Sequence, residues 1–278
     1  MKKFVFAVAT CLFIATANAA PKPVLVVAQI TDAHLRSEFD APARFRAALR
    51  HLRKNYPEVS MVINTGDSVD GVKNHDDAVA KWGFWKAGIE GELRGIPVYS
   101  VLGNHDIEGP ANDPLCGKDG ACRQFNMPSR YYSFDRDGWH FVMLDGNGFG
   151  GDKEQMAWLE KELNTKAPVA VVSHQPIFSV GAALHYPGDF IGNWKGLMAL
   201  FVKYPNVKLS LSGHVHLFDK AWYNGVSYVC GGALSGYWWE LKNSHDGKGA
   251  YHETRPGYGI AKLYADGSSE YEYVKFEN

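Results

Sequence analysis

Five short polar motifs carry residues that can hold a metal ion. They are Asp32-Ala33-His34, Gly66-Asp67, Gly103-Asn104-His105-Asp106, His174 and Gly213-His214-Val215-His216. A single tetrahedral zinc site takes about four ligands. The motifs offer more oxygen and nitrogen ligands than that, and no thiolate: Asp32, His34, Asp67, Asn104, His174, His214 and His216. The set therefore predicts two ions of intermediate hardness, such as Fe, Mn or Zn.

Two such ions would support in-line displacement at phosphorus. Ions about 3.5 to 4 Å apart ionise a shared water and neutralise charge on the attacking and leaving oxygens. Asp67 lies between the two groups of motifs and is the expected bridging carboxylate. His105 directly follows Asn104 and could donate a proton to the leaving group. Its other ring nitrogen needs a carboxylate partner, which Asp70 or Asp106 could supply.

Each motif also has a purely structural interpretation. Asp32, Asp67 and Asp106 could each cap the start of a helix, because each follows a strand-like run. Asn104 after Gly103 could be an ordinary turn residue. These explanations would have to hold for all the motifs at once. A metal site explains the whole set with one cause and is the better hypothesis.

Every motif directly follows a short apolar run, which is typical of a strand buried on both faces. The runs cover residues 24–30, 61–64, 98–102, 169–173 and 207–212. Amphipathic segments between them predict helices at 45–56, 76–89, 153–163 and 194–204. This repetition predicts a mainly parallel sheet covered on both faces, with its ligands beyond the carboxyl ends of the strands.

Two segments depart from that repetition. Residues 131–145 alternate around Arg136-Asp137-Gly138, and residues 257–264 and 270–275 flank Ala265-Asp266-Gly267. Both patterns indicate antiparallel hairpins. A second layer of antiparallel strands, packed on the first, is therefore expected.

Residues 1–20 have the composition of a secretory signal peptide. A basic start at Lys2 and Lys3 precedes an apolar run, and small residues follow at 17–19. We therefore expect an exported protein, periplasmic or secreted, with a single domain over residues 21–278. No later segment offers the roughly 20 consecutive apolar residues of a membrane span. A formal net charge of −1 gives no electrostatic footprint for nucleic acid, and the oligomeric state is not determined.

Cysteine spacing suggests one crosslink. Cys116 and Cys122 could close a small loop in an oxidising compartment. Cys230 would then remain unpaired in an apolar segment. We predict the Cys116–Cys122 disulfide.

The ordered motifs D-x-H, G-D, G-N-H-D, H and G-H-x-H, between residues 30 and 216, resemble the five blocks of the calcineurin-like metallophosphoesterases. The tail segments GGALSGYWW and PGYGIAKLYADG resemble bacterial members that include the class III cyclic-nucleotide phosphodiesterases. This resemblance implies an α/β fold. Two mixed β-sheets would pack as a sandwich flanked by helices, in four layers.

The resemblance also implies roles for the site residues. It divides the ligands between two ions, with Asp32, His34 and His216 at the first and Asn104, His174 and His214 at the second. Asp67 would bridge the ions, and His105 would protonate the leaving group. Asp70 would hold His105, because it matches the second Asp of a G-D-x-x-D-R-G block.

Departures from related subfamilies narrow the expected activity. Gly71 stands where protein phosphatases carry an Arg. His34 stands where purple acid phosphatases have Gly, and their Tyr ligand has no counterpart after Asp67. The second domain of periplasmic 5′-nucleotidases is absent. We therefore expect phosphodiester hydrolysis through a metal-bridging hydroxide, with His105 as the proton donor. A broad phosphomonoesterase or nucleotidase is the alternative, and a non-catalytic metal-binding module is a remote one.

Overall fold

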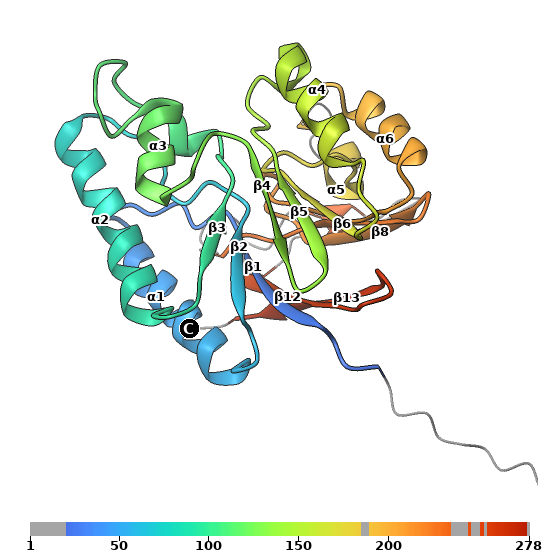
Figure 1. Ribbon diagram of the computed structural model, residues 1–278. Coiled ribbons are helices and arrows are strands. Elements are labelled where there is room, and N and C mark those ends of the chain that lie inside the picture. The colour runs from blue at the N-terminus through green and yellow to red at the C-terminus, as the bar shows by residue number, and fades with distance from the viewer. Residues whose placement is uncertain (1–20, 185–188, 235–243, 246–250, 253–254, 277–278) are drawn as a thin grey trace, which may run out of the picture.

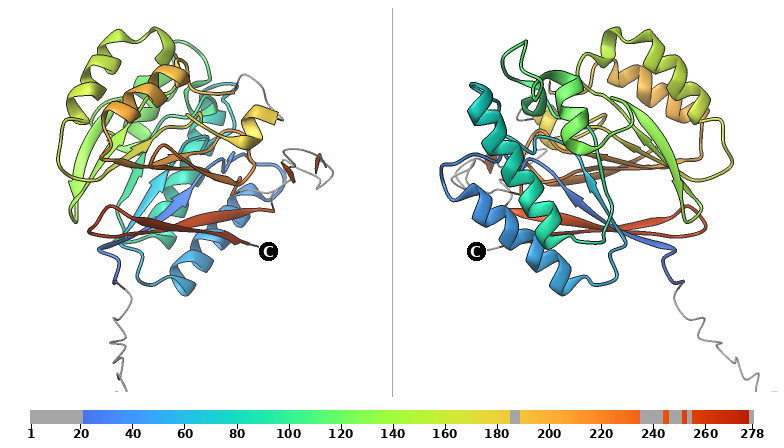
Figure 2. Two further views of the ribbon diagram at one scale, coloured as in Figure 1. Left: turned by 90° about the vertical axis from the view of Figure 1, so that its right-hand side faces the viewer. Right: turned by 60° about the vertical axis from the view of Figure 1, so that its left-hand side comes forward.

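Two mixed β-sheets pack face to face, and helices cover both outer faces (Figures 1 and 2). The computed structural model describes residues 21–184, 189–234, 244–245, 251–252 and 255–276. The predicted signal peptide, residues 1–20, lies outside the described residues. The expected sandwich of two mixed sheets flanked by helices is confirmed.

The first sheet has the strand order β13-β12-β1-β2-β3. Its strands are β1 (Leu25–Ile30), β2 (Met61–Asn64), β3 (Val98–Ser100), β12 (Gly257–Leu263) and β13 (Ser269–Lys275). Strands β1, β2 and β3 run parallel, and β12 is antiparallel to both β1 and β13. Helices α1 (Ala41–Asn55) and α2 (His75–Glu92) cover its outer face, where Phe45 and Trp82 pack with Ile30.

The second sheet has the order β4-β5-β6-β7-β9-β8. Its strands are β4 (Tyr132–Arg136), β5 (Trp139–Met143), β6 (Val169–Val172), β7 (Val207–Ser212), β8 (Asp219–Tyr223) and β9 (Val226–Cys230). The inner strands β5, β6, β7 and β9 are parallel, and the edge strands β4 and β8 are antiparallel to their neighbours. Helices α4 (Lys153–Glu162) and α6 (Trp194–Lys203) cover its outer face, where Leu159 and Phe201 pack with Val171.

Strands β1, β2 and β6 are mostly apolar because both of their faces are buried. In β1, Val27 faces the second sheet and packs with Phe141 and Leu211. Val26 and Ile30, on the opposite face of the same strand, pack under the helices. This arrangement explains why the strands show no alternation between apolar and polar residues.

The predicted strands, crossover helices and hairpins are present, but their assembly differs from the expectation. We expected one parallel sheet with a separate antiparallel layer, and this was wrong. The motif-bearing strands are divided between the sheets, with β1, β2 and β3 in one and β6 and β7 in the other. The hairpins β4–β5 and β12–β13 join different sheets by pairing with β6 and β1, respectively. Such pairing is set by long-range backbone contacts and leaves no local pattern.

Several short elements were not predicted. They are η1 (His105–Ile107), α3 (Gly117–Phe125), η2 (Phe149–Gly151), α5 (Val180–Leu184), β8, β9, β10 (Ser244–His245) and β11 (Tyr251–His252). Two glycines in α3 give it a weak helix propensity, which explains why its sequence resembles a loop. None of the described helices has the length and apolar character that crossing a bilayer requires.

The predicted disulfide is absent, because the thiols of Cys116 and Cys122 are free. Cys116 caps the start of α3, and Cys122 lies six residues later within that helix. Six residues correspond to about one and two-thirds helical turns, so the two side chains project from different sides. Cys116 packs in the core beneath the helices.

Candidate metal centre

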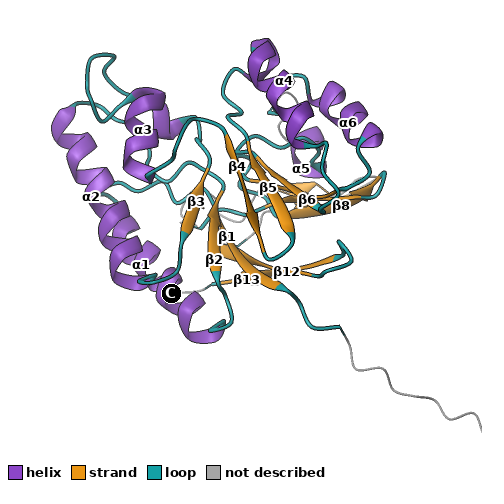
Figure 3. Cartoon of the chain, in the orientation of Figure 1, coloured by secondary structure: helices purple, strands orange, loops and turns teal. Residues whose placement is uncertain are grey.

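The loops that carry the five motifs meet beyond the carboxyl ends of β1, β2, β3, β6 and β7 (Figure 3). All of the ligands predicted from the sequence lie in this cluster. Hydrogen bonds join the motifs across the chain: the amide of His214 donates to Asp32, and the amide of His105 donates to Asp67. Residues far apart in the sequence are thus brought to one buried position.

The first group consists of Asp32, His34 and His216, all buried. Nε2 of His216 lies 3.1 Å from Oδ1 of Asp32 and 3.0 Å from Nε2 of His34. Two imidazole nitrogens that face each other at this distance point toward a common position. Their arrangement is that of donors around one centre.

The second group is built around His174. Nε2 of this residue lies 3.1 Å from Oδ2 of Asp67, 3.2 Å from Oδ1 of Asn104 and 3.2 Å from Nδ1 of His214. Oδ2 of Asp67 is also 3.7 Å from Nε2 of His34, in the first group. The Asp67 carboxylate therefore lies between the two groups.

The donor atoms fit two metal ions. Ligand atoms about 2.1 Å from an ion and roughly at right angles to each other are about 3 Å apart. Separations of 3.0 to 3.2 Å within each group match this spacing, and Nε2 of His34 lies 3.8 Å from Oδ1 of Asp32. Oxygen and imidazole donors without thiolate suit Fe, Mn or Zn. These residues could hold two such ions, and their assignment as ligands remains a prediction.

Hydrogen bonds from outside the cluster fix the orientation of the donors. Nδ1 of His174 donates to the carbonyl of Thr65 at 2.7 Å, which leaves Nε2 to face Asp67. Oδ2 of Asp32 accepts from the Thr31 hydroxyl at 2.5 Å, so that Oδ1 faces His216. Such bonds set the tautomer and the ring plane of a metal-binding histidine.

The electrostatics of the cluster favour bound cations. Burial raises the pKa of Asp67, but the charge of His174, its hydrogen bond and the charge of His34 together outweigh burial and lower the pKa to about 2. Burial lowers the pKa of His174, but the charge and hydrogen bond of Asp67, the charge of Asp32 and the hydrogen bond to Thr65 together outweigh burial and raise the pKa to about 9. Burial and the charge of His174 lower the pKa of His214 to about 4. The carboxylates thus stay ionised, while the crowded imidazoles cannot all be protonated.

Backbone strain is concentrated at the same positions. Asp32, His34, Asp67, His214 and His216 have φ angles of 51°, 45°, 51°, 76° and 57°. Side chains other than glycine rarely adopt this left-handed region, and each instance costs about 1–3 kcal/mol. The sharp turns direct side chains that follow a strand back toward the common centre.

His105 lies at the edge of the cluster, and 27% of its side chain is exposed. Its Nδ1 is 3.2 Å from Oε2 of Glu108 and 3.9 Å from Oδ1 of Asp70. Asp70 lies closer to His34, at 3.4 Å, and is held by Arg36 at 2.8 Å. Glu108, which was not predicted, is therefore the nearest carboxylate to His105 among these residues.

Asp106, the other candidate partner of His105, has a different environment. Its buried carboxylate accepts hydrogen bonds from the backbone amides of Asp67, Ser68, Val69 and Gly103. Burial and the charge of Asp67 raise its pKa to about 7. Asp106 thus joins the loops that follow β2 and β3.

The sequence profile of the calcineurin-like phosphoesterases matches residues 25–218, which include every predicted ligand. The chain belongs to the calcineurin-like phosphoesterase family. This membership confirms the resemblance inferred from the motifs. The protein is a metal-dependent phosphoester hydrolase.

Relatives cover most of this calcineurin-like phosphoesterase. A 3′,5′-cyclic-nucleotide phosphodiesterase of Nostoc sp. is 28% identical, and the match covers 87% of this chain and 89% of the relative. A 3′,5′-cyclic adenosine monophosphate phosphodiesterase of Haemophilus influenzae is 22% identical over 93% of this chain and 92% of its own. A dimetal phosphatase structure from Danio rerio has the same fold, with a TM-score of 0.66 at 15% identity, covering 87% of this chain and 94% of its own.

Sequence reasoning missed the residues that support the phosphoesterase centre from outside. Asn147 donates to the carbonyl of Leu102 at 3.0 Å and accepts from Gln175 at 3.1 Å. Asn147 therefore connects the segment just before Asn104 with the segment just after His174. Asn147 lies outside the motifs, and no sequence signal singled it out. For Gln175, the only signal in the sequence was its position directly after His174.

Proposed function

We propose that this protein hydrolyses a phosphodiester at the candidate metal centre, with His105 as the proton donor. The observation that carries the proposal is the arrangement of two donor groups on either side of Asp67, beside a partly exposed His105. Two ions bound there would supply an activated water and neutralise charge on the phosphoryl oxygens. The remaining steps depend on side chains of this chain.

The donor groups orient the reacting centre. Asp32, His34 and His216 would hold the first ion, and Asp67 would be shared with the second. Hydrogen bonds with the Thr31 hydroxyl and the Thr65 carbonyl fix the orientation of Asp32 and His174. The amide of His105 donates to Oδ1 of Asp67 at 2.8 Å, which fixes the proton donor relative to the shared carboxylate.

His105 protonates the leaving oxygen through Nε2. The carboxylates of Glu108 and Asp70 lie 3.2 Å and 3.9 Å from its Nδ1, respectively. Asp70 also contacts Nδ1 of His34 at 3.4 Å, so it supports both the donor and a ligand. Arg36 anchors Asp70 in this position.

A 3′,5′-cyclic nucleotide is the proposed substrate class. Full-length relatives named as cyclic-nucleotide phosphodiesterases support this choice. The absence of an Arg after Asp70 supports it too, because Gly71 offers no side chain to bind a terminal phosphate. The leaving group of a cyclic diester is a sugar oxygen, which needs the proton that His105 provides.

Two substrates with the same leaving group test the reaction class. The protein is loaded separately with Mn, Zn and Fe and assayed with bis(p-nitrophenyl) phosphate and p-nitrophenyl phosphate. We expect faster turnover of the diester and hydrolysis of 3′,5′-cyclic AMP to a nucleoside monophosphate. Preference for the monoester would instead establish a phosphomonoesterase or nucleotidase. Bound metal without turnover of any substrate would indicate a binding module.

We also propose that the protein is exported and that residues 21–278 form one catalytic domain. The composition of residues 1–20 supports export. Both sheets contribute ligands to one centre, which supports a single domain. N-terminal sequencing of the protein recovered from its producing cells should begin near Ala20 or Pro21. An intact Met1 would contradict export by a cleaved signal peptide.

A further inference from the structure

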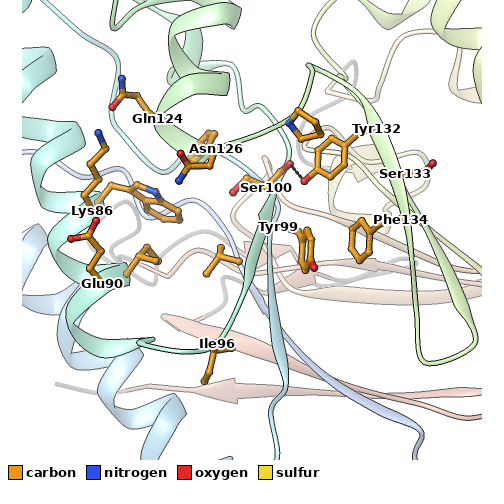
Figure 4. A pocket seen from close by; sticks show the side chains of 15 residues that line it. Lys86, Glu90, Ile96, Tyr99, Ser100, Gln124, Asn126, Tyr132, Ser133 and Phe134 are labelled. Carbon is orange, nitrogen blue, oxygen red and sulfur yellow. Dashed lines mark hydrogen bonds between the residues drawn. The ribbon is translucent and has the colours of Figure 1, made fainter.

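A cavity of about 420 Å³ lies between α2, β3, the end of α3 and β4 (Figure 4). Its volume is within the range of small-molecule sites. None of the predicted metal ligands lines it. The cavity is therefore separate from the metal centre, and the proposed hydrolysis does not account for it.

The cavity exists because the sandwich is open along one side. Strands β3 and β4 are edge strands of different sheets, and neither pairs with the other. The hydroxyl of Tyr132 on β4 donates to the carbonyl of Ser100 on β3 at 2.9 Å. This hydrogen bond joins the two edge strands, as Figure 4 shows, and both of its residues line the cavity.

Aromatic rings form much of the lining. Tyr99 and Phe134 are stacked, with ring centroids 4.0 Å apart and an interplanar angle of 16°. Trp85 and Phe125 meet edge to face, with centroids 5.4 Å apart. All four of these residues line the cavity. Phe134 is stacked between Tyr99 and Phe141, whereas Tyr99 has no second stacked partner among the described residues. Stacking on an aromatic side chain contributes about 1–3 kcal/mol per nucleic acid base, so Tyr99 favours a flat ring as the occupant.

Two side-chain amides add hydrogen-bonding capacity. Gln124 is only 7% exposed, lines the cavity and makes no side-chain hydrogen bond within the described part of the chain. Asn126 ends α3 with a left-handed φ of 55° and also lines the cavity. An amide offers both a donor and an acceptor, which matches the edge of a nucleobase.

Charge indicates that the ligand is neutral. The charged residues of the lining are Lys86 and Glu90, one of each sign. Figure 4 shows both on the side of α2, with Tyr99 and Phe134 on the opposite side. Opposite charges on the same side leave no net attraction for a phosphate. A nucleoside or base fits these features better than a nucleotide.

We propose that this cavity binds a neutral nucleobase or nucleoside as a second ligand, at a site apart from the metal centre. Stacking against the aromatic walls supplies most of the affinity. The amides of Gln124 and Asn126 select a ring that has both donors and acceptors on its edge. The inference does not depend on the proposed hydrolysis.

Equilibrium dialysis of the metal-loaded protein against labelled adenosine tests the proposal. Adenosine carries no phosphoester, so the proposed activity cannot consume it. We expect saturable binding of one molecule per chain, with AMP binding no more tightly. Tyr99→Ala should raise Kd about tenfold through lost stacking. Asn126→Gly keeps the backbone conformation and should raise Kd by roughly three- to tenfold.

Asn224→Gly is the matched control, because Asn224 also has a left-handed φ, 50°, but lies in the β8–β9 turn outside the cavity. It should leave Kd unchanged, and turnover of the diester should be unchanged in all three variants. The absence of saturable adenosine binding would overturn the proposal. Binding that survives Tyr99→Ala and Asn126→Gly but is lost in His174→Ala would place the ligand at the metal centre and overturn it as well.

Discussion

Hydrogen bonds with backbone groups orient individual residues of the candidate metal centre. The Thr65 carbonyl holds Nδ1 of His174, and the amide of His214 donates to Asp32 at 3.0 Å. These contacts involve the ligand atoms that face away from the cluster. The remaining nitrogen of His174 and oxygen of Asp32 point into it. Removing such an outer contact commonly weakens metal binding 10- to 100-fold. The orientation of these ligands therefore depends on backbone groups as well as on the ligand side chains.

His105→Ala tests the division of roles between the ligands and the proton donor. We expect kcat for the diester to fall about 10²- to 10⁴-fold, because general acid catalysis is lost. Metal content, measured by inductively coupled plasma mass spectrometry, should stay unchanged. His75→Ala is the control, since that side chain is exposed and pairs with Asp113 away from the cluster. Loss of metal in the His105 variant would make His105 a ligand, a role that its position beside His34 and Asp67 permits.

At the scale of elements, the loops after β2 and β3 form a single unit. The Asp106 carboxylate accepts from the amide of Asp67 in one loop and from that of Gly103 in the other, both at 2.9 Å. The loops pack so closely that a methyl group on Gly103 would collide with Asp67. The position of the shared carboxylate is therefore set by the contact between two strand ends.

Gly103→Ala tests this close contact. The added methyl group has no space, so we expect a loss of about 1–3 kcal/mol in unfolding free energy and weaker metal binding. Urea denaturation and metal titration measure the two effects. Gly83→Ala is the matched control, because a methyl group there meets nothing within 4 Å in α2. That change should stabilise the protein by about 0.5–1 kcal/mol. Equal stability of the two variants would refute the close contact.

Across the whole molecule, the centre connects the two sheets. Asp32, His34, Asp67 and Asn104 follow strands of the first sheet, while His174, His214 and His216 follow strands of the second. Ions bound between them would crosslink both halves of the sandwich. Because the unfolded chain lacks this site, metal binding should stabilise the fold as a whole.

Metal addition should accordingly raise the melting temperature of the intact protein. At a free Mn²⁺ concentration one hundred times Kd, a single site adds about 2.7 kcal/mol to the free energy of unfolding. Calorimetry with Mn²⁺ and with EDTA measures the difference. His174→Ala should lose most of the increment, and the exposed His75→Ala should retain it. Identical melting temperatures at saturating metal and in EDTA would contradict an ion site between the sheets.

The position of the site could be predicted from the sequence because its residues directly follow apolar strands. The pairing of His105 with Glu108 was missed, since it depends on the short helix η1. The disulfide prediction failed for a similar reason. Cys116 and Cys122 were taken to lie in a loop, but helix α3 holds their side chains on different sides.

Local sequence patterns predict the longer strands and helices, their order and the types of ligand. These features depend on local patterns of apolar and polar residues, which a chain carries whether or not it is folded. Only the tertiary structure decided how the strands divide between two sheets. The pairing of Leu25 with Leu263 joins opposite ends of the chain through backbone hydrogen bonds, which no local pattern encodes. That pairing and the parallel pairing of β5 with β6 place the strands in two sheets. Both sheets then supply candidate ligands, and a cavity lies between their edge strands β3 and β4.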